Sequence, residues 1–231
     1  GISKKDTAAT TYELLVGTAK ADAAVIKTQF KKVDVIPASM DLAAAEIDLI
    51  ETEHRESALK NALSAVREKY DYIFIDCPPS LGLITINALN AGDTVLVPIQ
   101  CEYYALEGLS QLVNTIKIVK TNYNPSIEIE GILFTMFDAR LNLANQVVSE
   151  VEKYFPNKVF ETKIPRNVRI SEAPSHGMPV MYYDKTSKGS EAYELVCHEI
   201  LGEPLALPKK KRRGIFSFKK NSGKENHSDN E

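Results

Sequence analysis

Cysteine is scarce in this sequence, and so are long apolar runs. The three cysteines, Cys77, Cys101 and Cys197, are scattered and form no CxxC pair. Such a set is typical of a reducing compartment and provides no structural metal site. No apolar run approaches the roughly 20 residues that span a bilayer, and the first ten residues have no apolar stretch of the signal-peptide type. The sequence therefore predicts a globular cytoplasmic protein.

The sequence also lacks a glycine-rich phosphate loop. None of its eleven glycines starts a GxxxxGK[ST] motif. Yet the stretch YDYIFIDCPPSLG, residues 70–82, reads as a buried strand that ends in an acid and is followed by two prolines. This pattern is typical of nucleotide-binding folds, which place their phosphate loop after a first, central strand. We therefore expect the 231 residues to begin partway through such a fold, without its first strand, loop and first helix.

Positive charge is scarce in the body of the chain and concentrated at its end. Residues 208–231 carry eight Lys/Arg and three Asp/Glu, a net of +5. The remaining 207 residues carry 20 Lys/Arg against 28 Asp/Glu, a net of −8. This balance excludes simple attraction of the whole protein to nucleic acid, so any such binding must be local. The composition of residues 203–231 predicts a disordered basic tail.

What the sequence does contain is an alternation of strand and helix patterns. The expected strands are short and apolar without polar alternation, as in parallel sheets covered on both faces. They cover residues 33–37, 72–76, 93–99, 127–138 and 158–165. The expected helices cover residues 10–17, 41–50, 54–70, 83–91, 105–123, 142–155 and 186–202. The predicted fold class is α/β, a doubly wound, mostly parallel sheet with helices on both faces, in one domain spanning residues 1–202.

Four blocks of the sequence resemble the ParA/Soj family of chromosome- and plasmid-partitioning ATPases, within the MinD/ParA superfamily with its deviant Walker motif. They read YDYIFIDCPPSLGLITINAL, VPIQCEYYALEGLSQL, TMFDARLNLANQV and IPRNVRISEAPSHGMPV, and they follow the family's order within residues 12–201. The resemblance implies a P-loop NTPase fold with ATP and Mg²⁺ as cofactors. Because the phosphate loop is absent from these residues, we expect this chain alone not to hydrolyse ATP.

The resemblance also implies a cycle for the complete protein. It would form a homodimer with ATP and bind double-stranded DNA without sequence preference. Hydrolysis, stimulated by a ParB-like (Spo0J-like) partner, would then release it from the DNA. A protein of this kind is expected in the cytoplasm, associated with the nucleoid and not with a membrane.

Asp76 is the candidate catalytic and metal-binding residue. It ends the predicted strand 72–76, at the edge where parallel sheets meet their ligands. A carboxylate there can hold a magnesium-bound water, although an Asp that only caps the next helix would look the same. Pro78 and Pro79 fix φ in the turn that follows. Such a stiff turn suits a loop that senses the γ-phosphate, so Pro79 is a candidate nucleotide contact.

The motif IPRNVR supplies further candidate nucleotide contacts. The resemblance places Pro165, Arg166 and Asn167 against the adenine base, and an Asn side chain can both donate and accept there. Met136, at the end of the preceding strong strand, is expected to line the same pocket. The alternative interpretation is a polar surface turn.

Two further pairs of residues are assigned to macromolecular contacts. Arg140 and Arg169 are the candidates for DNA binding, because arginine donates to phosphate through a planar fork. Ordinary surface charge is the alternative. The resemblance places Glu102 and Tyr103 beside the nucleotide-dependent dimer interface. The alternative there is an acidic helix start beside half-buried tyrosines.

Two other functional classes stay open from the sequence. One is a membrane-associated division-site ATPase of the MinD type, which the tail KKKRRGIFSFKK favours and the basic motif RNVR opposes. The other is a non-catalytic, truncated interaction protein that pairs with a full-length relative.

Overall fold

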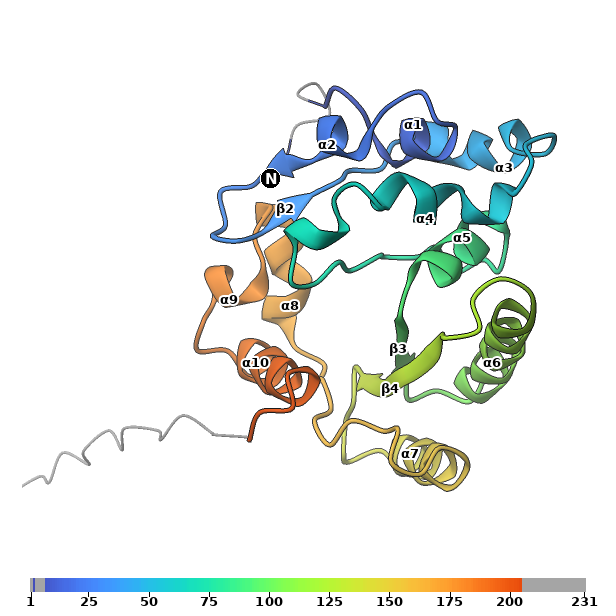
Figure 1. Ribbon diagram of the computed structural model, residues 1–231. Coiled ribbons are helices and arrows are strands. Elements are labelled where there is room, and N and C mark those ends of the chain that lie inside the picture. Colours follow the sequence, from blue (N-terminus) through green and yellow to red (C-terminus); the bar gives the residue numbers. More distant parts are fainter. Residues whose placement is uncertain (1, 3–6, 205–231) are drawn as a thin grey trace, which may run out of the picture.

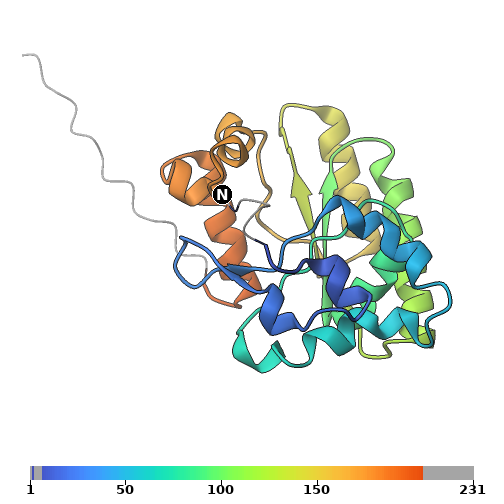
Figure 2. The ribbon, with the colours of Figure 1, turned by 90° about the horizontal axis from the view of Figure 1, so that it is seen from above.

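The computed structural model describes residue 2 and residues 7–204 (Figures 1 and 2). Nearly all of the basic tail predicted for residues 203–231 lies outside the described residues. Within the described part of the chain, no helix is both long enough and apolar enough to cross a membrane.

A parallel pair of strands, β3 (Thr94–Gln100) and β4 (Glu128–Thr135), forms the main sheet (Figure 1). The two strands pair along their whole lengths, and helix α6 (Ala105–Asn122) connects them. Residues 159–165 continue the sheet beyond β4 through two isolated parallel bridges. The parallel, helix-connected sheet predicted from the sequence is therefore confirmed in these segments.

Helices cover both faces of this sheet. Helices α6 and α7 (Asn142–Tyr154) lie on one face, and α10 (Lys188–Ile200) lies on the other (Figures 1 and 2). The side chains of β4 alternate between the two faces: Phe134 packs with α7, and Leu133 packs with α10. Because both faces are covered, β4 needs apolar residues at consecutive positions, which explains its near-continuous apolar run.

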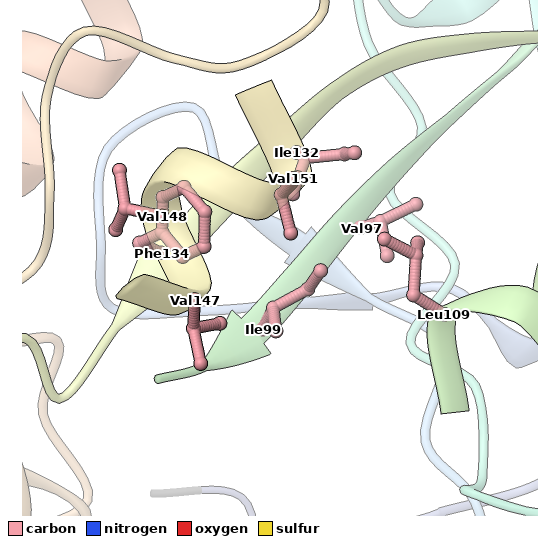
Figure 3. Close-up of a cluster of buried hydrophobic side chains, with 8 residues drawn as sticks. All are labelled: Val97, Ile99, Leu109, Ile132, Phe134, Val147, Val148 and Val151. Carbon is pink, nitrogen blue, oxygen red and sulfur yellow. The ribbon is translucent and has the colours of Figure 1, made fainter. Parts of the chain in front are cut away.

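The largest cluster of buried apolar side chains lies between the sheet and helices α6 and α7 (Figure 3). It contains Val97, Ile99, Leu109, Ile132, Phe134, Val147, Val148 and Val151. Ile132 and Phe134 are fully buried, so this cluster holds the strands in place from one side. Burial of each such side chain stabilises the fold by about 1.5–3 kcal/mol.

The N-terminal part of the chain differs from the prediction in its strand pairing. The predicted strand 33–37 is present as β2 (Asp34–Val35), but it pairs antiparallel with β1 (Ile26–Lys27) and not with the parallel sheet. Lys27 Nζ lies 2.6 Å from Asp34 Oδ2, and the Tyr70 hydroxyl donates to the same oxygen at 2.8 Å. The Lys27–Asp34 pair joins the two strands of the hairpin. The Tyr70 bond attaches the hairpin to the end of the helical segment that covers residues 55–69.

Helix α1 (Thr11–Leu15) confirms the predicted start of the first helix. Thr10 is its N-cap, with the reciprocal Thr10 and Glu13 contacts of a capping box. The short helix α2 (Ala21–Ala24) follows and was not predicted.

The two helices predicted for residues 41–50 and 54–70 are broken into short pieces. They are η2 (Met40–Ala44), α3 (Ala45–Asp48), η3 (Arg55–Ser57), α4 (Ala58–Leu63) and η4 (Arg67–Lys69). Two buried asparagines on α5 (Leu83–Ala91) explain part of the breakage. Asn87 Nδ2 donates to the carbonyl of Arg55 at 2.9 Å, and Asn90 Nδ2 donates to the carbonyl of Glu56 at 2.9 Å. These carbonyls are therefore bonded to α5 side chains, and the α-helix begins only at Ala58.

The predicted strand 72–76 is wrong as a paired strand. In the structure these residues run extended from η4 to α5 but join no sheet (Figure 1). A strand needs a neighbouring backbone at about 4.8 Å, and among the described residues none pairs with this segment. Its apolar sequence predicted an extended conformation correctly, but could not supply the partner.

The C-terminal part contains two short helices that the sequence analysis did not predict, α8 (Val168–Glu172) and α9 (Val180–Tyr183), joined through η5 (Ala173–His176). The predicted helix 186–202 is present as α10. Its N-cap Ser187 accepts a hydrogen bond from the Ser190 N–H at 3.1 Å, and Gly202 follows its end with φ +65°.

Two glycines provide a matched test of this packing. A Cβ at Gly131 in β4 would lie against the Phe160 ring and 3.3 Å from the Lys158 carbonyl oxygen, whereas a Cβ at Gly108 in α6 would meet nothing within 4 Å. We expect Gly131→Ala to lower the free energy of unfolding by about 1–3 kcal/mol. Gly108→Ala should raise it by about 0.5–1 kcal/mol. Urea unfolding of both variants measures this, and equal effects would contradict the described contact of β4 with residues 158–160.

Candidate functional site

The candidate site lies at the carboxyl edge of the parallel sheet. Because β3, β4 and residues 159–165 run in the same direction, the loops that follow them open at one edge. The Phe137 N–H donates to the Ile164 carbonyl at 3.0 Å, and Phe137 bridges to Pro165. The structure therefore places Met136 and Pro165, both predicted nucleotide contacts, on adjacent loops.

Met136 has an unusual backbone conformation. Its φ is +50°, in the left-handed region that side chains other than glycine seldom adopt, and 46% of the residue is exposed. Such local strain is often found at binding sites. The residue directly follows β4, where the chain turns toward Asp138, so the strained turn presents an apolar side chain to solvent at the carboxyl edge.

Arg140 is held by Asp138 in the same loop. Arg140 Nε donates to Asp138 Oδ1 at 2.9 Å, and Nη2 donates to Oδ2 at 2.6 Å. These bonds, with a contribution from the nearby Arg166 charge, lower the pKa of Asp138 to about 2. The Arg140 side chain is still 88% exposed, and the fork leaves part of its N–H donors unused. It is therefore positioned and still able to bind an anion.

Arg169 differs from Arg140 in that it has two acidic partners. Its Nη1 lies 2.8 Å from Glu172 Oε2, and its Nε lies 3.3 Å from Asp184 Oδ2. The bond from Arg169, followed by that from the Tyr183 hydroxyl, lowers the pKa of Glu172. Two carboxylates thus surround one guanidinium, so phosphate binding here would have to compete with them.

Asn167 caps α8. Its Oδ1 accepts a hydrogen bond from the Arg169 N–H at 2.9 Å, so this oxygen is occupied, while the amide donors keep their capacity. Arg166 is exposed next to it. The loop therefore offers donors more readily than acceptors to a ligand at this edge.

Asp76 and Pro79 lie across a groove from the β3 edge. The groove has a volume of about 1830 Å³, and Gln100 and Glu102 after β3 line it together with Asp76 and Pro79. Tyr103 does not line it, but is exposed and makes an edge-to-face contact with Tyr104 at 5.4 Å between ring centroids. The structure thus groups Asp76, Pro79 and Glu102, and separately groups Met136, Arg140, Pro165 and Arg166.

The residues fit a magnesium ion that takes most of its ligands from elsewhere. Within the described residues no cluster of three or more His, Cys, Asp or Glu side chains could hold a metal ion alone. Asp76 is an exposed single carboxylate. Magnesium is commonly held by one or two carboxylates with waters and substrate phosphates completing its shell, which matches one acid at this position.

The sequence analysis missed two residues of this edge. Asp138 ends the predicted strand 127–138, as Asp76 ends the predicted strand 72–76, and that signal could have identified it. Lys163 lies with its Nζ 5.8 Å from the centre of the Phe137 ring, and its charge also acts on Cys101 at the end of β3. Nothing in the spacing of Lys163 distinguishes it from a surface lysine, so only the structure identifies it.

Comparison with known proteins gives close relatives for most of the chain. The family described as an AAA domain matches residues 1–129. The sporulation initiation inhibitor protein Soj of Bacillus subtilis is 55% identical over 200 residues, which cover 87% of this chain and 79% of Soj. The chromosome partitioning protein ParA of Myxococcus xanthus is 49% identical over 215 residues, covering 93% of this chain and 75% of that protein.

A solved structure shares the fold. The cobyrinic acid a,c-diamide synthase of Mycobacterium smegmatis, with a bound ATP analogue and magnesium, is 32% identical with a TM-score of 0.69. The match covers 90% of this chain and 79% of that one. The α/β fold of the P-loop NTPases is thereby confirmed.

The Asp138–Arg140 fork gives a prediction about pH. The pKa of Asp138 is lowered in the folded protein. The contribution of the fork to stability is therefore present above about pH 4, the ordinary Asp range, and is lost as the pH falls through about 2. In Arg140→Gln, we expect the pKa of Asp138 to rise from about 2 toward its ordinary value, while the hydrogen bond from the N–H of residue 140, 3.1 Å from Asp138 Oδ1 in the parent, still holds it below that value. NMR titration of the carboxyl carbon measures this, with Arg169→Gln as the control that should leave Asp138 unchanged. An Asp138 pKa that stays near 2 in Arg140→Gln would show that the fork is not its cause.

Proposed function

The chain belongs to the ParA/Soj family of chromosome-partitioning ATPases, and on this premise we propose that it acts in DNA segregation as a nucleotide-dependent switch. In the complete protein, ATP with Mg²⁺ supports a homodimer that binds double-stranded DNA without sequence preference. Hydrolysis, stimulated by a ParB-like partner, releases the DNA. The observation that supports this most directly is that Met136, Arg140 and Pro165 lie at the carboxyl edge of the sheet, and that Asp76 lines a groove together with Gln100 at the end of β3.

The nucleotide would meet both groups of candidate residues. Asp76 would hold a magnesium-bound water in place, and the chemistry that the ion would supply is neutralisation of charge on the phosphates. Pro79 holds the following turn stiff. Met136 and Pro165 offer apolar contact to the base, and the free donors of Arg166 and Asn167 offer polar contact. The energetic role of this chain's own residues is therefore positioning and electrostatic stabilisation.

DNA binding is proposed for Arg140 and Arg169. The body of the chain is acidic, with a net charge of −8 outside residues 208–231, so phosphate contacts must come from a few placed cations. Arg140 is exposed and oriented, whereas Arg169 is shared between two acids. We therefore assign the larger share of the DNA affinity to Arg140.

The dimer interface is proposed at Glu102 and Tyr103. Tyr103 and its neighbour Tyr104 are 72% and 76% exposed, and exposed aromatic side chains are enriched at protein interfaces. They follow β3, close to the groove that Asp76 lines. A dimer formed there would bring the second subunit beside the nucleotide. A protein with this cycle works in the cytoplasm on the nucleoid.

The role of Asp76 can be tested in a chain that carries a phosphate-loop segment ahead of residue 1. We expect Asp76→Ala to lower the steady-state ATPase rate by roughly a hundredfold or more while the fold is kept. Asp71→Ala is the control, because Asp71 lies in the same exposed segment at its other end. Turnover of Asp76→Ala within about threefold of the parent would mean that Asp76 has no catalytic role. The helix-cap alternative is already wrong, because the N-cap of α5 is Gly82 and no side chain caps that helix.

The DNA-binding proposal is tested in the same chain. Arg140→Glu should weaken binding about tenfold or more, because it removes a charge-assisted contact and adds repulsion. The loss should be equal on unrelated sequences, and the salt slope should fall by roughly 0.9 for each lost contact. Arg169→Glu should act in the same direction with a smaller effect. Lys153→Glu is the control, since Lys153 is an exposed cation on α7 already paired with Glu150.

Deletion of residues 208–231 tests the competing explanation. If the deletion abolishes DNA binding and Arg140→Glu does not weaken it, the tail is the anchor and the assignment to the arginines fails. Binding of the parent to anionic vesicles in preference to DNA, lost with the tail, would favour the membrane-associated class instead.

A further inference from the structure

The β1–β2 hairpin carries positive charge in a body that is otherwise acidic. Residues 25–36 contain three lysines and one aspartate, a net of +2, whereas the chain outside residues 208–231 has a net charge of −8. One of these lysines, Lys27, is paired with Asp34 in the stem of the hairpin. The other two, Lys31 and Lys32, lie in the hairpin tip, residues 28–33. Neither takes part in the nucleotide or DNA contacts proposed above.

The hairpin tip is a closed turn. The Thr28 hydroxyl donates to the Val33 carbonyl at 2.6 Å, and the Val33 N–H donates to the Phe30 carbonyl at 3.2 Å. The Phe30 N–H in turn donates to the Thr28 hydroxyl oxygen at 3.1 Å. Lys32 has a φ of +62°, in the left-handed region that side chains other than glycine seldom adopt. These bonds span the turn and hold the backbone of Lys31 and Lys32 between them.

An aromatic contact fixes the hairpin tip against helix α9. The ring centroids of Phe30 and Tyr182 lie 4.8 Å apart, and the ring planes are inclined by 52°, within the range of distances at which aromatic pairs attract. Figure 1 shows the hairpin loop beside α9. The tip is therefore attached to a folded helix and does not project as a free loop.

Helix α9 also holds the residues around Arg169. The hydroxyl of Tyr183, the neighbour of Tyr182, donates to Glu172 Oε2 at 3.1 Å, and the same oxygen lies 2.8 Å from Arg169 Nη1. The hairpin tip and Arg169 are thus connected to the same four-residue helix. Arg169 is one of the two arginines proposed for DNA binding, so the tip is connected to the surface where DNA is expected.

The acids of this region are already paired. Asp34 in the hairpin is bonded to Lys27, and Asp184, directly after α9, lies against Arg169. The two tip lysines are exposed, and none of the ion pairs among the described residues includes either of them. Their charge is therefore uncompensated and open to an anionic partner.

Duplex DNA is the anionic partner that these observations favour. It presents about one phosphate charge per 1.7 Å of its axis, and a lysine ammonium binds such phosphates as a point charge. An anionic lipid surface would attract the same two lysines. The connection of the tip to Arg169 through α9 favours DNA over lipid.

We propose that the tip of the β1–β2 hairpin is a further contact to the DNA backbone, made by Lys31 and Lys32 and held in position by Phe30 against α9. This contact deepens the proposed function, on which the choice of DNA as the partner rests. Because it is made to phosphate, it adds affinity without base preference. It requires no nucleotide, since the tip is already formed in this chain.

Lysine labelling of the 231-residue chain tests the contact residue by residue. Acetylation by a water-soluble reagent is followed by mass spectrometry, with and without a short DNA duplex of arbitrary sequence at low salt. We expect both tip lysines to react at least about threefold more slowly with DNA bound, because an amine in contact with phosphate is shielded. The lysines of the basic tail are scored separately in the same spectra, so binding by the tail does not mask the result.

Lys117 is the internal control for the labelling. It is exposed on α6 and has no acidic partner among the described residues. Helix α6 lies on the opposite side of the molecule from the hairpin (Figures 1 and 2). Its rate of acetylation should stay unchanged when DNA binds.

A matched pair of double variants measures the contribution to affinity. Lys31→Gln/Lys32→Gln should weaken DNA binding at least about tenfold at low salt and lower the salt slope by roughly 0.9 for each lysine. Lys60→Gln/Lys117→Gln removes the same charge from exposed lysines on α4 and α6 and should change the affinity little. Fluorescence anisotropy gives the affinities, and thermal melting of both variants checks the fold.

Three outcomes would overturn the proposal. One is that DNA fails to slow the labelling of the tip lysines, which includes a chain that does not bind DNA at all. Another is equal DNA affinity of the two double variants. The third is protection of the tip lysines by phosphatidylglycerol vesicles and not by DNA, which would make a lipid surface the partner.

The same DNA assay separates a failed tip contact from a failed function. If Arg140→Glu weakens DNA binding and Lys31→Gln/Lys32→Gln behaves as its control, the tip is no contact and the proposed function stands. If the tip variant loses affinity while Arg140→Glu and Arg169→Glu keep it, the tip contact stands and the assignment of DNA binding to the arginines fails.

Discussion

Parallel pairing between β3 and β4 is the constraint on which the rest of the structure depends. A parallel pair cannot be closed by a tight turn, so each connection must cross the sheet as a helix. Helices α6 and α7 therefore lie on one face. Helix α10, which follows the last extended segment, covers the other face, so the strands between them must be apolar on both sides. The same direction of the strands brings their following loops to one edge. Core packing and site position thus have a single cause.

At the carboxyl edge, neighbouring acids decide how available each arginine is to an anion. Arg140 and Arg169 are both surface arginines in loops or short helices, and neither differs from the other in the sequence. In the structure one has a single carboxylate and the other has two. The number of competing acids decides how much of each guanidinium is available to a phosphate, and this number depends on Asp184, fifteen positions beyond Arg169 along the chain.

Residues 72–76 show that a segment can have an extended conformation without pairing to another strand. Their sequence is that of an interior strand, and they adopt an extended backbone, yet they remain outside the sheet and expose Phe74. Strand propensity acts locally, but the stability of a strand comes from its neighbours on either side. The local preference of residues 72–76 and their tertiary environment therefore disagree beside β3.

The sequence by itself determined the α/β class, the strands β3 and β4, the helices α5, α6, α7 and α10, and the position of Met136 at the end of β4. These follow from local patterns, because apolar periodicity and caps act over a few residues. Only the tertiary structure decided the antiparallel pairing of β2, the breaks that Asn87 and Asn90 impose, the unpaired state of residues 72–76, and the partners of Arg140 and Arg169. Each of these depends on a backbone or charge brought near from elsewhere in the chain, and a local pattern carries no information about which neighbour arrives.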